Sequence, residues 1–173
     1  MEPPAPGAPP GGVHDLVRAA QRGDPAAMDA LVRALAPYVT RVCGAIALDR
    51  GDDAVQETFI AVLRRIGQLR EPAALHGWVR RIAVREAVRA AGSTSGPRAD
   101  ELDLPAPLPD LDAVLDVRAA LAGLSPEHRA VLALRDLDGL PEADVAALLS
   151  VPEGTVKSRL HRARAAAREV LSR

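Results

Sequence analysis

The chain has 173 residues, of which 48% are hydrophobic, 26% charged and only 2% aromatic, enough for one compact domain or two small ones. Its 22 basic and 23 acidic residues nearly cancel, so net charge alone indicates no nucleic-acid partner. No stretch approaches the roughly 18 to 20 uncharged apolar residues that cross a bilayer, and the N-terminus lacks the order of a secretion signal. We therefore expect a cytoplasmic protein without membrane insertion.

Residues 1–12 are mostly Pro, Gly and Ala and predict a disordered leader. Beyond them, Asp24 followed by Pro25 is typical of a helix N-terminus, and apolar residues recur after it at helical spacing. Pro37 is expected to end this helix or to start the next, whose apolar series runs to a breaker at residues 49–51.

Two further helices are predicted in the first half of the chain. Asp52 is expected to cap one of them, and its inner apolar stripe consists of Val55, Phe59, Val62 and Ile66. The other spans about residues 73–91. No stretch alternates with period two, so a sheet is not expected.

Residues 92–111 combine Gly, Ser, Pro and acidic side chains without an apolar face, which is typical of an interdomain linker. We therefore predict an all-α protein with two small helical domains, residues 13–91 and 112–173. In the second domain, Ser125 is expected to cap a helix that stops near Gly139. A short helix, a tight turn at residues 150–152 and a long basic helix then form a helix-turn-helix.

Charge is distributed unevenly along the chain. From residue 64 to residue 91, seven arginines stand against two glutamates, and from residue 155 to the C-terminus six basic residues stand against one glutamate. Between these blocks, residues 93–116 carry one arginine and six acidic residues. Two basic blocks therefore flank an acidic spacer, which indicates a polyanionic partner that the net charge conceals.

The last helix has the clearest functional pattern. Its periodicity buries Val156, Leu160 and Ala163. The opposite arc carries Lys157, Ser158, His161, Arg162 and Ala165, and Arg159 and Arg164 flank it. This face suits insertion into a major groove. The alternative is a solvated helix with cations near its C-terminal end, but that alternative does not explain Lys157 and Arg159 at its start.

The fourth and third helices carry different exposed faces. In the fourth, Arg81, Arg85 and Arg89 form a stripe suited to a phosphate backbone, unless it is simply solvated. Trp78 lies beside the stripe and would more often be a core residue, and Glu86 falls unexpectedly inside the apolar arc.

In the third helix, the outer arc combines Asp53, Gln56, Glu57, Ile60 and Arg64. Such a mixed acidic and apolar face indicates a protein partner. The alternative is that Ile60 packs on a neighbouring helix.

The sequence contains few residue combinations that are typical of an enzyme active site. A lone Cys43 excludes a disulfide framework and a cysteine-built zinc site. Asp52, Asp53 and Glu57 could gather a cation, but no calcium loop, phosphate loop or metal-spaced His pair accompanies them. Ser125 and His128 are close in sequence, yet Ser125 is better explained as a cap. We expect no cofactor, no metal and no enzymatic activity.

Five motifs resemble conserved regions of the extracytoplasmic-function (ECF) group of bacterial sigma factors. DDAVQETF (52–59) and GWVRRIA (77–83) resemble the group's second region. LSPEHR (124–129), LRDLDGL (134–140) and GTVKSRLHRAR (154–164) resemble its fourth region. The order and spacing of the two sets make the resemblance specific, and it covers nearly everything outside the leader and the linker.

The resemblance implies a first domain that binds core RNA polymerase and the minus-ten promoter element, and a second that binds the minus-thirty-five element. The polymerase-binding residues would be Asp53, Gln56, Glu57 and Ile60. The minus-ten residues would be Gln68, Arg70, Trp78, Arg80, Arg81, Arg85 and Arg89, and the minus-thirty-five residues Thr155, Lys157, Ser158, Arg159, His161 and Arg162. Members of the group are not enzymes by themselves and are often held by an anti-sigma factor.

The chain departs from the group's pattern in the fourth helix. Arg85 and Arg89 stand where the group commonly has Asn and Asp, and Arg80 replaces a usual aromatic residue. The main alternative function is a helix-turn-helix regulator with an N-terminal helical sensor or dimerisation domain. A third possibility is a helical adaptor that binds no nucleic acid.

Overall fold

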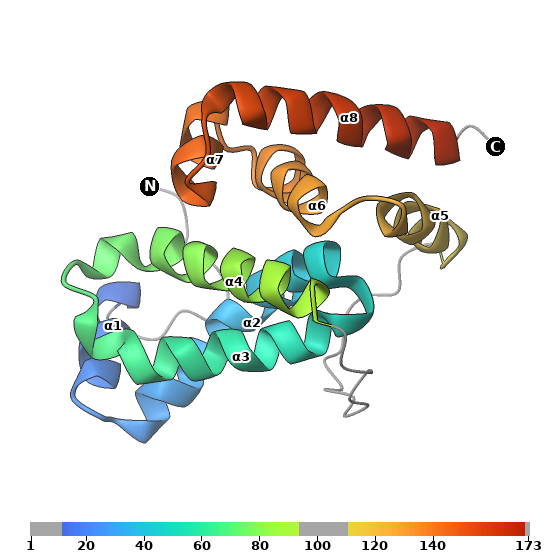
Figure 1. Ribbon diagram of the computed structural model, residues 1–173. Helices are drawn as coiled ribbons and strands as arrows, with labels where there is room; N and C mark the ends of the chain where they lie inside the picture. The colour runs from blue at the N-terminus through green and yellow to red at the C-terminus, as the bar shows by residue number, and fades with distance from the viewer. Residues whose placement is uncertain (1–11, 94–110, 172–173) are drawn as a thin grey trace, which may run out of the picture.

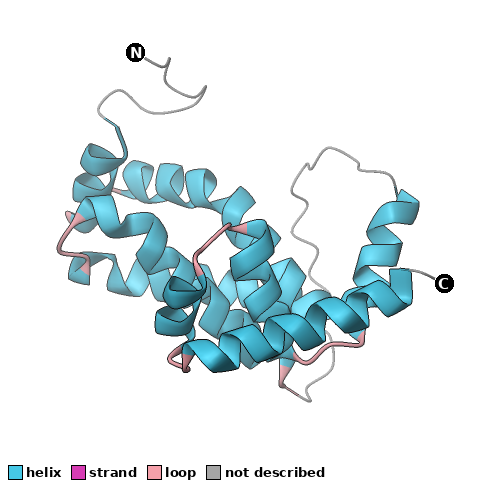
Figure 2. Cartoon of the chain, turned by 90° about the horizontal axis from the view of Figure 1, so that it is seen from above, coloured by secondary structure: helices cyan, strands magenta, loops and turns pink. Residues whose placement is uncertain are grey.

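The computed structural model describes residues 12–93 and 111–171, and these residues form helices and no strand (Figure 2). The N-terminal domain consists of α1 (Gly12–Gln21), α2 (Pro25–Ala47), α3 (Gly51–Arg65) and α4 (Leu75–Ala91). The C-terminal domain consists of α5 (Leu111–Ala122), α6 (Pro126–Leu132), the π-helical turn η4 (Ala133–Leu137), α7 (Glu142–Leu149) and α8 (Glu153–Leu171). The all-α, two-domain prediction is thus confirmed.

The predicted leader and linker fall mainly on residues 1–11 and 94–110, which lie outside the described residues. At their borders, Gly12 is the first residue of α1 and Leu111 the first of α5. The helices that flank the predicted linker therefore begin and end close to the expected positions.

Local sequence signals account for several helix ends. The Asp24 carboxylate accepts hydrogen bonds from the backbone N–H groups of Ala26 (2.9 Å) and Ala27 (3.2 Å), which confirms the predicted cap of α2. Ser125 Oγ accepts from the His128 N–H at the start of α6. Ser150 ends α7 in the left-handed conformation (φ 56°), which turns the chain into α8.

The prediction for Pro37 was wrong, because α2 runs without interruption from residue 25 to residue 47. Proline in a helix interior removes one backbone hydrogen bond and crowds the preceding turn. Leu31 and Leu35 before it, and Val39 and Val42 after it, are all buried in the same core. Tertiary burial on both sides therefore outweighs the local cost.

The prediction that Asp52 caps α3 was also wrong. A short 3-10 turn, η1 (Leu48–Arg50), leads directly into α3 at Gly51, and Asp52 lies in the first helical turn. At this position its carboxylate still interacts favourably with the positive end of the helix dipole. A Cβ on Gly51 would lie only 3.1 Å from Gly44 Cα, so glycine permits the close approach of α2 and α3.

The core is continuous across both domains. Buried residues of α2, α3 and α4 form one cluster with residues of α6, η4, α7 and α8. Figure 1 shows α6 lying between α8 and the N-terminal domain, where it contacts α2 and α4. The C-terminal domain therefore packs against the N-terminal domain through α6.

The high apolar content of α2 follows from its central place in this core. By length and composition alone, the helical run from Pro25 to Gln68 contains a window that could cross a membrane. A core helix passes the same test, and α2 packs against α1, α3, α4 and α6. Burial against these helices accounts for its composition.

We expect Pro37→Ala to raise the free energy of unfolding by about 1–3 kcal/mol, because it restores a helix hydrogen bond and relieves crowding. Pro25→Ala is the matched control in the same helix. Pro25 occupies the first turn, where its missing N–H costs nothing, so this change should lower stability by about 0.4–1 kcal/mol. Denaturant titration measures both, and a destabilised Pro37→Ala variant would show that the proline ring itself contributes favourable packing at this position.

Candidate promoter and polymerase interface

Helix α8 has the rotation that the sequence predicted. Val156, Leu160 and Ala163 are buried. The exposed arc consists of Lys157, Ser158, His161 and Arg162, and the half-buried Thr155 and Arg159 border it. The Ser158 hydroxyl donates to the Thr155 carbonyl (3.0 Å). A row of cationic and hydrogen-bonding side chains thus faces away from the domain, which is the arrangement that a major-groove helix requires.

Arg164 of the same helix is held inside the domain. Its guanidinium donates two hydrogen bonds to the Asp136 carboxylate of η4, from Nε to Oδ2 (3.2 Å) and from Nη2 to Oδ1 (2.5 Å). This bidentate pair raises the pKa of Arg164. Arg164 therefore fixes α8 against η4 and does not simply extend the exposed cationic arc, as its flanking position in the sequence had suggested.

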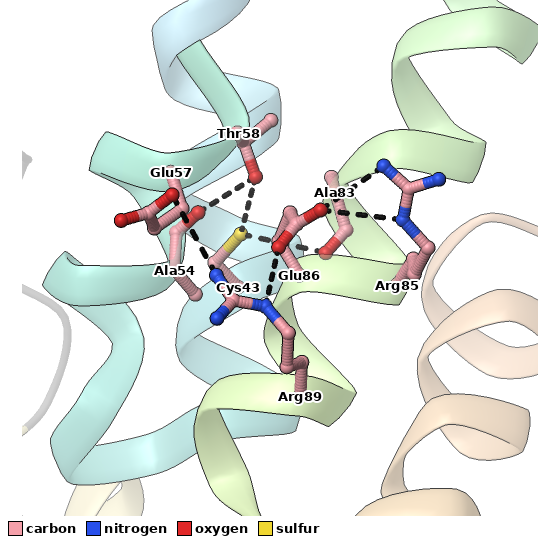
Figure 3. Close-up of polar contacts among 8 residues, drawn as sticks. All are labelled: Cys43, Ala54, Glu57, Thr58, Ala83, Arg85, Glu86 and Arg89. Carbon is pink, nitrogen blue, oxygen red and sulfur yellow. Dashed lines mark hydrogen bonds and ion pairs between the residues drawn. The ribbon is translucent and has the colours of Figure 1, made fainter. Parts of the chain in front are cut away.

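Glu86 organises the arginines of α4 (Figure 3). Only 8% of this residue is exposed, and its carboxylate accepts hydrogen bonds from Arg85 Nε (3.2 Å) and Nη2 (3.0 Å) and from Arg89 Nε (2.7 Å). Burial on its own would raise the pKa of the Glu86 carboxyl, but the bonds from Arg89 and Arg85 outweigh it and lower that pKa. Glu86 lies in the apolar arc because its partners are adjacent on the surface.

The predicted arginine stripe therefore carries less free positive charge than its sequence indicates. Arg81, Arg85 and Arg89 are all exposed, but Glu86 neutralises one charge. Arg89 Nη2 also lies 3.6 Å from Glu57 Oε2 of α3. Both members of this second pair are more than half exposed, so the contact contributes little to stability.

Beneath this cluster, small polar groups of α2, α3 and α4 are fully enclosed (Figure 3). The Thr58 hydroxyl donates to the Ala54 carbonyl (2.6 Å), and Cys43 Sγ lies 3.8 Å from Thr58 Oγ1. Burial raises the pKa of the Cys43 thiol to about 11, so the thiol stays protonated. Cys43 therefore acts as a packing residue in the core.

The two remaining minus-ten candidates of α4 are differently placed. Trp78 is half-buried and packs against the core. Arg80 points to the domain contact, where its Nε donates to Tyr38 Oη (3.1 Å) and to Asp138 Oδ2 (2.9 Å). The sequence reasoning missed Tyr38 and Asp138, which are 100 residues apart and share no local pattern.

The loop before α4 is fixed by α1. Gln68 and Arg70 have exposed side chains, while Gln21 Nε2 donates to the carbonyls of Ile66 (2.9 Å) and Leu69 (2.7 Å). The Arg18 guanidinium donates to the Arg70 carbonyl (3.3 Å). The backbone of this loop is thereby held while its polar side chains stay available.

The outer face of α3 is open to solvent. Gln56 and Glu57 are exposed, Ile60 is 41% exposed, and Leu63 on the next turn is 38% exposed. The alternative that Ile60 packs on a neighbouring helix is therefore wrong. Asp53 is half-buried and pairs with Arg50 (2.8 Å), so it is the least accessible of the four predicted polymerase-binding residues.

Within residues 12–93 and 111–171, no group of three or more His, Cys, Asp or Glu side chains is placed to hold a metal ion. The exposed surfaces instead consist of a cationic helix face, an arginine–glutamate cluster and a mixed apolar face.

Two sequence families match parts of this chain. Residues 31–95 match the sequence family described as sigma-70 region 2, and residues 115–166 match sigma-70 region 4. The ECF RNA polymerase sigma-E factor of Escherichia coli strain K12 is 31% identical over 174 residues, covering 87% of this chain and 90% of that protein.

Two mycobacterial relatives are longer than this chain. The ECF RNA polymerase sigma factor SigE of Mycolicibacterium smegmatis is 36% identical, covering 87% of this chain and 65% of the relative. SigM of Mycobacterium tuberculosis strain H37Rv is also 36% identical, covering 66% of this chain and 60% of the relative. The matched region thus spans about 60–65% of the length of these two proteins.

Two solved structures have the same fold. CnrH in complex with the cytosolic domain of CnrY gives a TM-score of 0.64 at 22% identity, covering 92% of this chain and 97% of that one. The sigma factor RpoE in complex with the anti-sigma factor NepR from Bartonella quintana gives 0.61 at 24% identity, covering 82% and 94%.

We expect Glu86→Gln to lower the free energy of unfolding by about 1–3 kcal/mol near neutral pH, because two arginines lose their buried charged acceptor. The lowered pKa of Glu86 means that its stabilisation is present above the ordinary glutamate pKa of 4.5 and is lost as pH falls through the folded-state value. The difference between Glu86→Gln and the unsubstituted chain should therefore shrink below about pH 4.5.

The matched control is Asp29→Asn, which removes an exposed ion pair with Arg33 and should change stability by at most about 0.5 kcal/mol. Thermal or denaturant unfolding between pH 3 and pH 7 measures both variants. A Glu86→Gln cost that persists unchanged at acid pH would mean that the carboxylate charge is not the stabilising group.

Proposed function

Because this chain belongs to the ECF RNA polymerase sigma factors, we propose that it binds core RNA polymerase and directs promoter-specific initiation of transcription. The observation that carries this proposal is the presence of sigma regions 2 and 4, in order, on two separate helical domains. A helix-turn-helix regulator would need only the second domain, and the first would then have no reason to resemble region 2.

The minus-thirty-five element is the ligand we propose for α8. Its exposed residues Lys157, His161 and Arg162 would approach base edges and phosphates in the major groove, with Thr155, Ser158 and Arg159 beside them. The buried residues Val156 and Leu160 would hold the helix at the angle that the groove requires.

The minus-ten element is the ligand we propose for the loop and α4. Gln68 and Arg70 would reach the unpaired strand from the loop. Arg81, Arg85 and Arg89 would follow its phosphates, with Glu86 setting the directions of the last two guanidinium groups. The half-buried Trp78 would become available only after local rearrangement, and Arg80 only after Asp138 of the C-terminal domain releases it.

Core polymerase is the partner we propose for the outer face of α3. Exposed Ile60 and Leu63 supply apolar area, and Gln56 and Glu57 supply polar contacts beside it. Such a centre of apolar residues with a polar rim is typical of protein interfaces. Asp53 would act through its ion pair with Arg50.

This function has three further consequences. The chain would work in the cytoplasm, where polymerase acts, and would leave nucleotidyl transfer to the polymerase. Because RpoE of Bartonella quintana was solved in complex with an anti-sigma factor, an anti-sigma partner is also part of the proposal.

Run-off transcription with purified core polymerase tests the proposal. The full chain should yield a discrete transcript without any other specificity factor. Glu57→Lys combined with Ile60→Arg should abolish both the transcript and retention by core polymerase in a pull-down, while the circular dichroism spectrum stays helical. A chain that shifts duplex DNA but never supports a transcript would instead favour a helix-turn-helix regulator.

Substitutions on the two faces of α8 should have different effects, one on DNA binding and the other on stability. Arg162→Ala should weaken binding to minus-thirty-five duplex by about 1–3 kcal/mol without changing stability. Leu160→Ala should instead lower stability by about 2–5 kcal/mol through lost burial and a cavity. Duplex titration and thermal melting of the full chain distinguish them, and an Arg162→Ala variant that melts early would show that the DNA-facing arc is wrongly assigned.

A further inference from the structure

A buried carboxylate joins the two domains. Asp138 follows η4 in the C-terminal domain, and only 2% of its side chain is exposed. Its Oδ2 accepts hydrogen bonds from Tyr38 Oη (2.6 Å) and Arg80 Nε (2.9 Å), and its Oδ1 accepts from Arg41 Nη2 (3.4 Å). All three donors belong to α2 and α4 of the N-terminal domain.

The three donors form a site with the chemistry of an anion receptor. The guanidinium carbons of Arg41 and Arg80 lie 5.6 Å and 6.0 Å from the centre of the Tyr38 ring, so the ring spaces the two cations. Burial and the hydrogen bond to Asp138 raise the pKa of the Tyr38 hydroxyl, which therefore remains a donor. Two positive charges and a hydroxyl suit a phosphate as well as a carboxylate.

The rest of the domain contact supports closure without filling this site. Arg129 of α6 is buried, and its Nε donates to the Ile46 carbonyl near the end of α2 (2.5 Å). This carbonyl is one of the last four in α2, which lack partners within the helix. Arg118 of α5 pairs with Asp49 at the surface.

The closed arrangement is too small to contact both promoter elements. Elements at minus ten and minus thirty-five are about 25 base pairs apart, or about 85 Å along B-form DNA. A compact chain of this length has a radius of gyration of about 16 Å. The domains must therefore separate on a promoter, and Asp138 then leaves Tyr38, Arg41 and Arg80.

We propose that Tyr38, Arg41 and Arg80 form a binding site for a DNA backbone phosphate, and that Asp138 occupies this site while the domains are closed. The inference rests on the proposed function, since it places the phosphate in the promoter strand that α4 follows. Arg80 is the link between the two, because it directly precedes Arg81 of the exposed stripe. Closure and DNA binding through this site are then mutually exclusive.

Removal of the competing carboxylate tests this exclusion. Asp138→Asn is compared with Asp136→Asn, which removes the same charge two residues away. Asp136 pairs with Arg164 of its own domain, so this control removes a carboxylate without removing the contact between the domains. The probe is a fluorescein-labelled single-stranded 20-nucleotide DNA of mixed sequence, titrated by anisotropy at low salt. Small-angle X-ray scattering of the free proteins reports closure.

We expect Asp138→Asn to bind the oligonucleotide at least about fivefold more tightly than the unsubstituted chain, because a larger fraction of molecules is open. Its radius of gyration should also increase. Asp136→Asn should match the unsubstituted chain in both measurements. Equal affinity and equal radius for the two variants would overturn the proposal.

A second pair of variants identifies the phosphate site itself. In the Asp138→Asn background, Arg41→Ala should remove most of the gain in affinity. Arg33→Ala is the matched control, since Arg33 is an exposed arginine of the same helix that pairs with Asp29, and it should leave most of the gain. Equal effects of the two changes would overturn the site even if the domains open.

These outcomes are separable from those of the proposed function. If the chain supports run-off transcription but Asp138→Asn behaves like Asp136→Asn, the proposed role in initiation stands and the proposal that Asp138 competes with DNA fails. If the chain supports no transcript but the variants differ as expected, the proposed anion site stands and the proposed function fails.

Discussion

A buried carboxylate has to be compensated, and Asp138 is compensated from the opposite domain. Leaving one member of a buried ion pair without its partner costs about 3–5 kcal/mol. Within the described residues, the side-chain donors to Asp138 are Tyr38, Arg41 and Arg80. The domains therefore cannot separate in water without solvating this group or replacing it. The placement of α6 on α2 and α4, and through it the placement of α8, depends on this constraint.

Carboxylates also position guanidinium groups at two other places in this arginine-rich chain. Asp136 fixes Arg164 inside the C-terminal domain, and Glu86 holds Arg85 and Arg89 on α4. Each carboxylate reduces the repulsion between neighbouring arginines and sets the direction of the guanidinium group that it binds. The outward arc of α8 differs, because its cations project from a face whose opposite side is purely apolar. The exposed cations of α8 are thus oriented by packing and not by pairing.

Sequence periodicity was sufficient where burial follows the helical repeat. The rotation of α8 follows from Val156, Leu160 and Ala163, and the caps at Asp24 and Ser125 follow from local hydrogen bonding. These features depend on neighbours within a few residues. Glu86 was recognised as anomalous, and the arginines one residue before and three after it were the available signal for its role.

Features decided by tertiary contacts were not predictable from one sequence. Pro37 lies within α2 because the core holds both halves of the helix, and Asp52 is not a cap because the η1 turn brings Gly51 against Gly44. The family resemblance implies that Arg80 contacts promoter DNA, but no local pattern indicates its hydrogen bond to Asp138, which is 58 residues away in the chain. Only the packing of α6 on the N-terminal domain brings that pair together.

We expect the chain to be closed when it is free and open on a promoter. Single-molecule energy transfer between labels at Ala34→Cys on α2 and Ala147→Cys on α7 measures this directly, because both positions are exposed and Cys43 is buried. The free protein should give one short-distance population, and addition of core polymerase with promoter DNA should convert it to a long-distance population. A free protein that already shows the long distance, or a promoter complex that keeps the short one, would contradict the account.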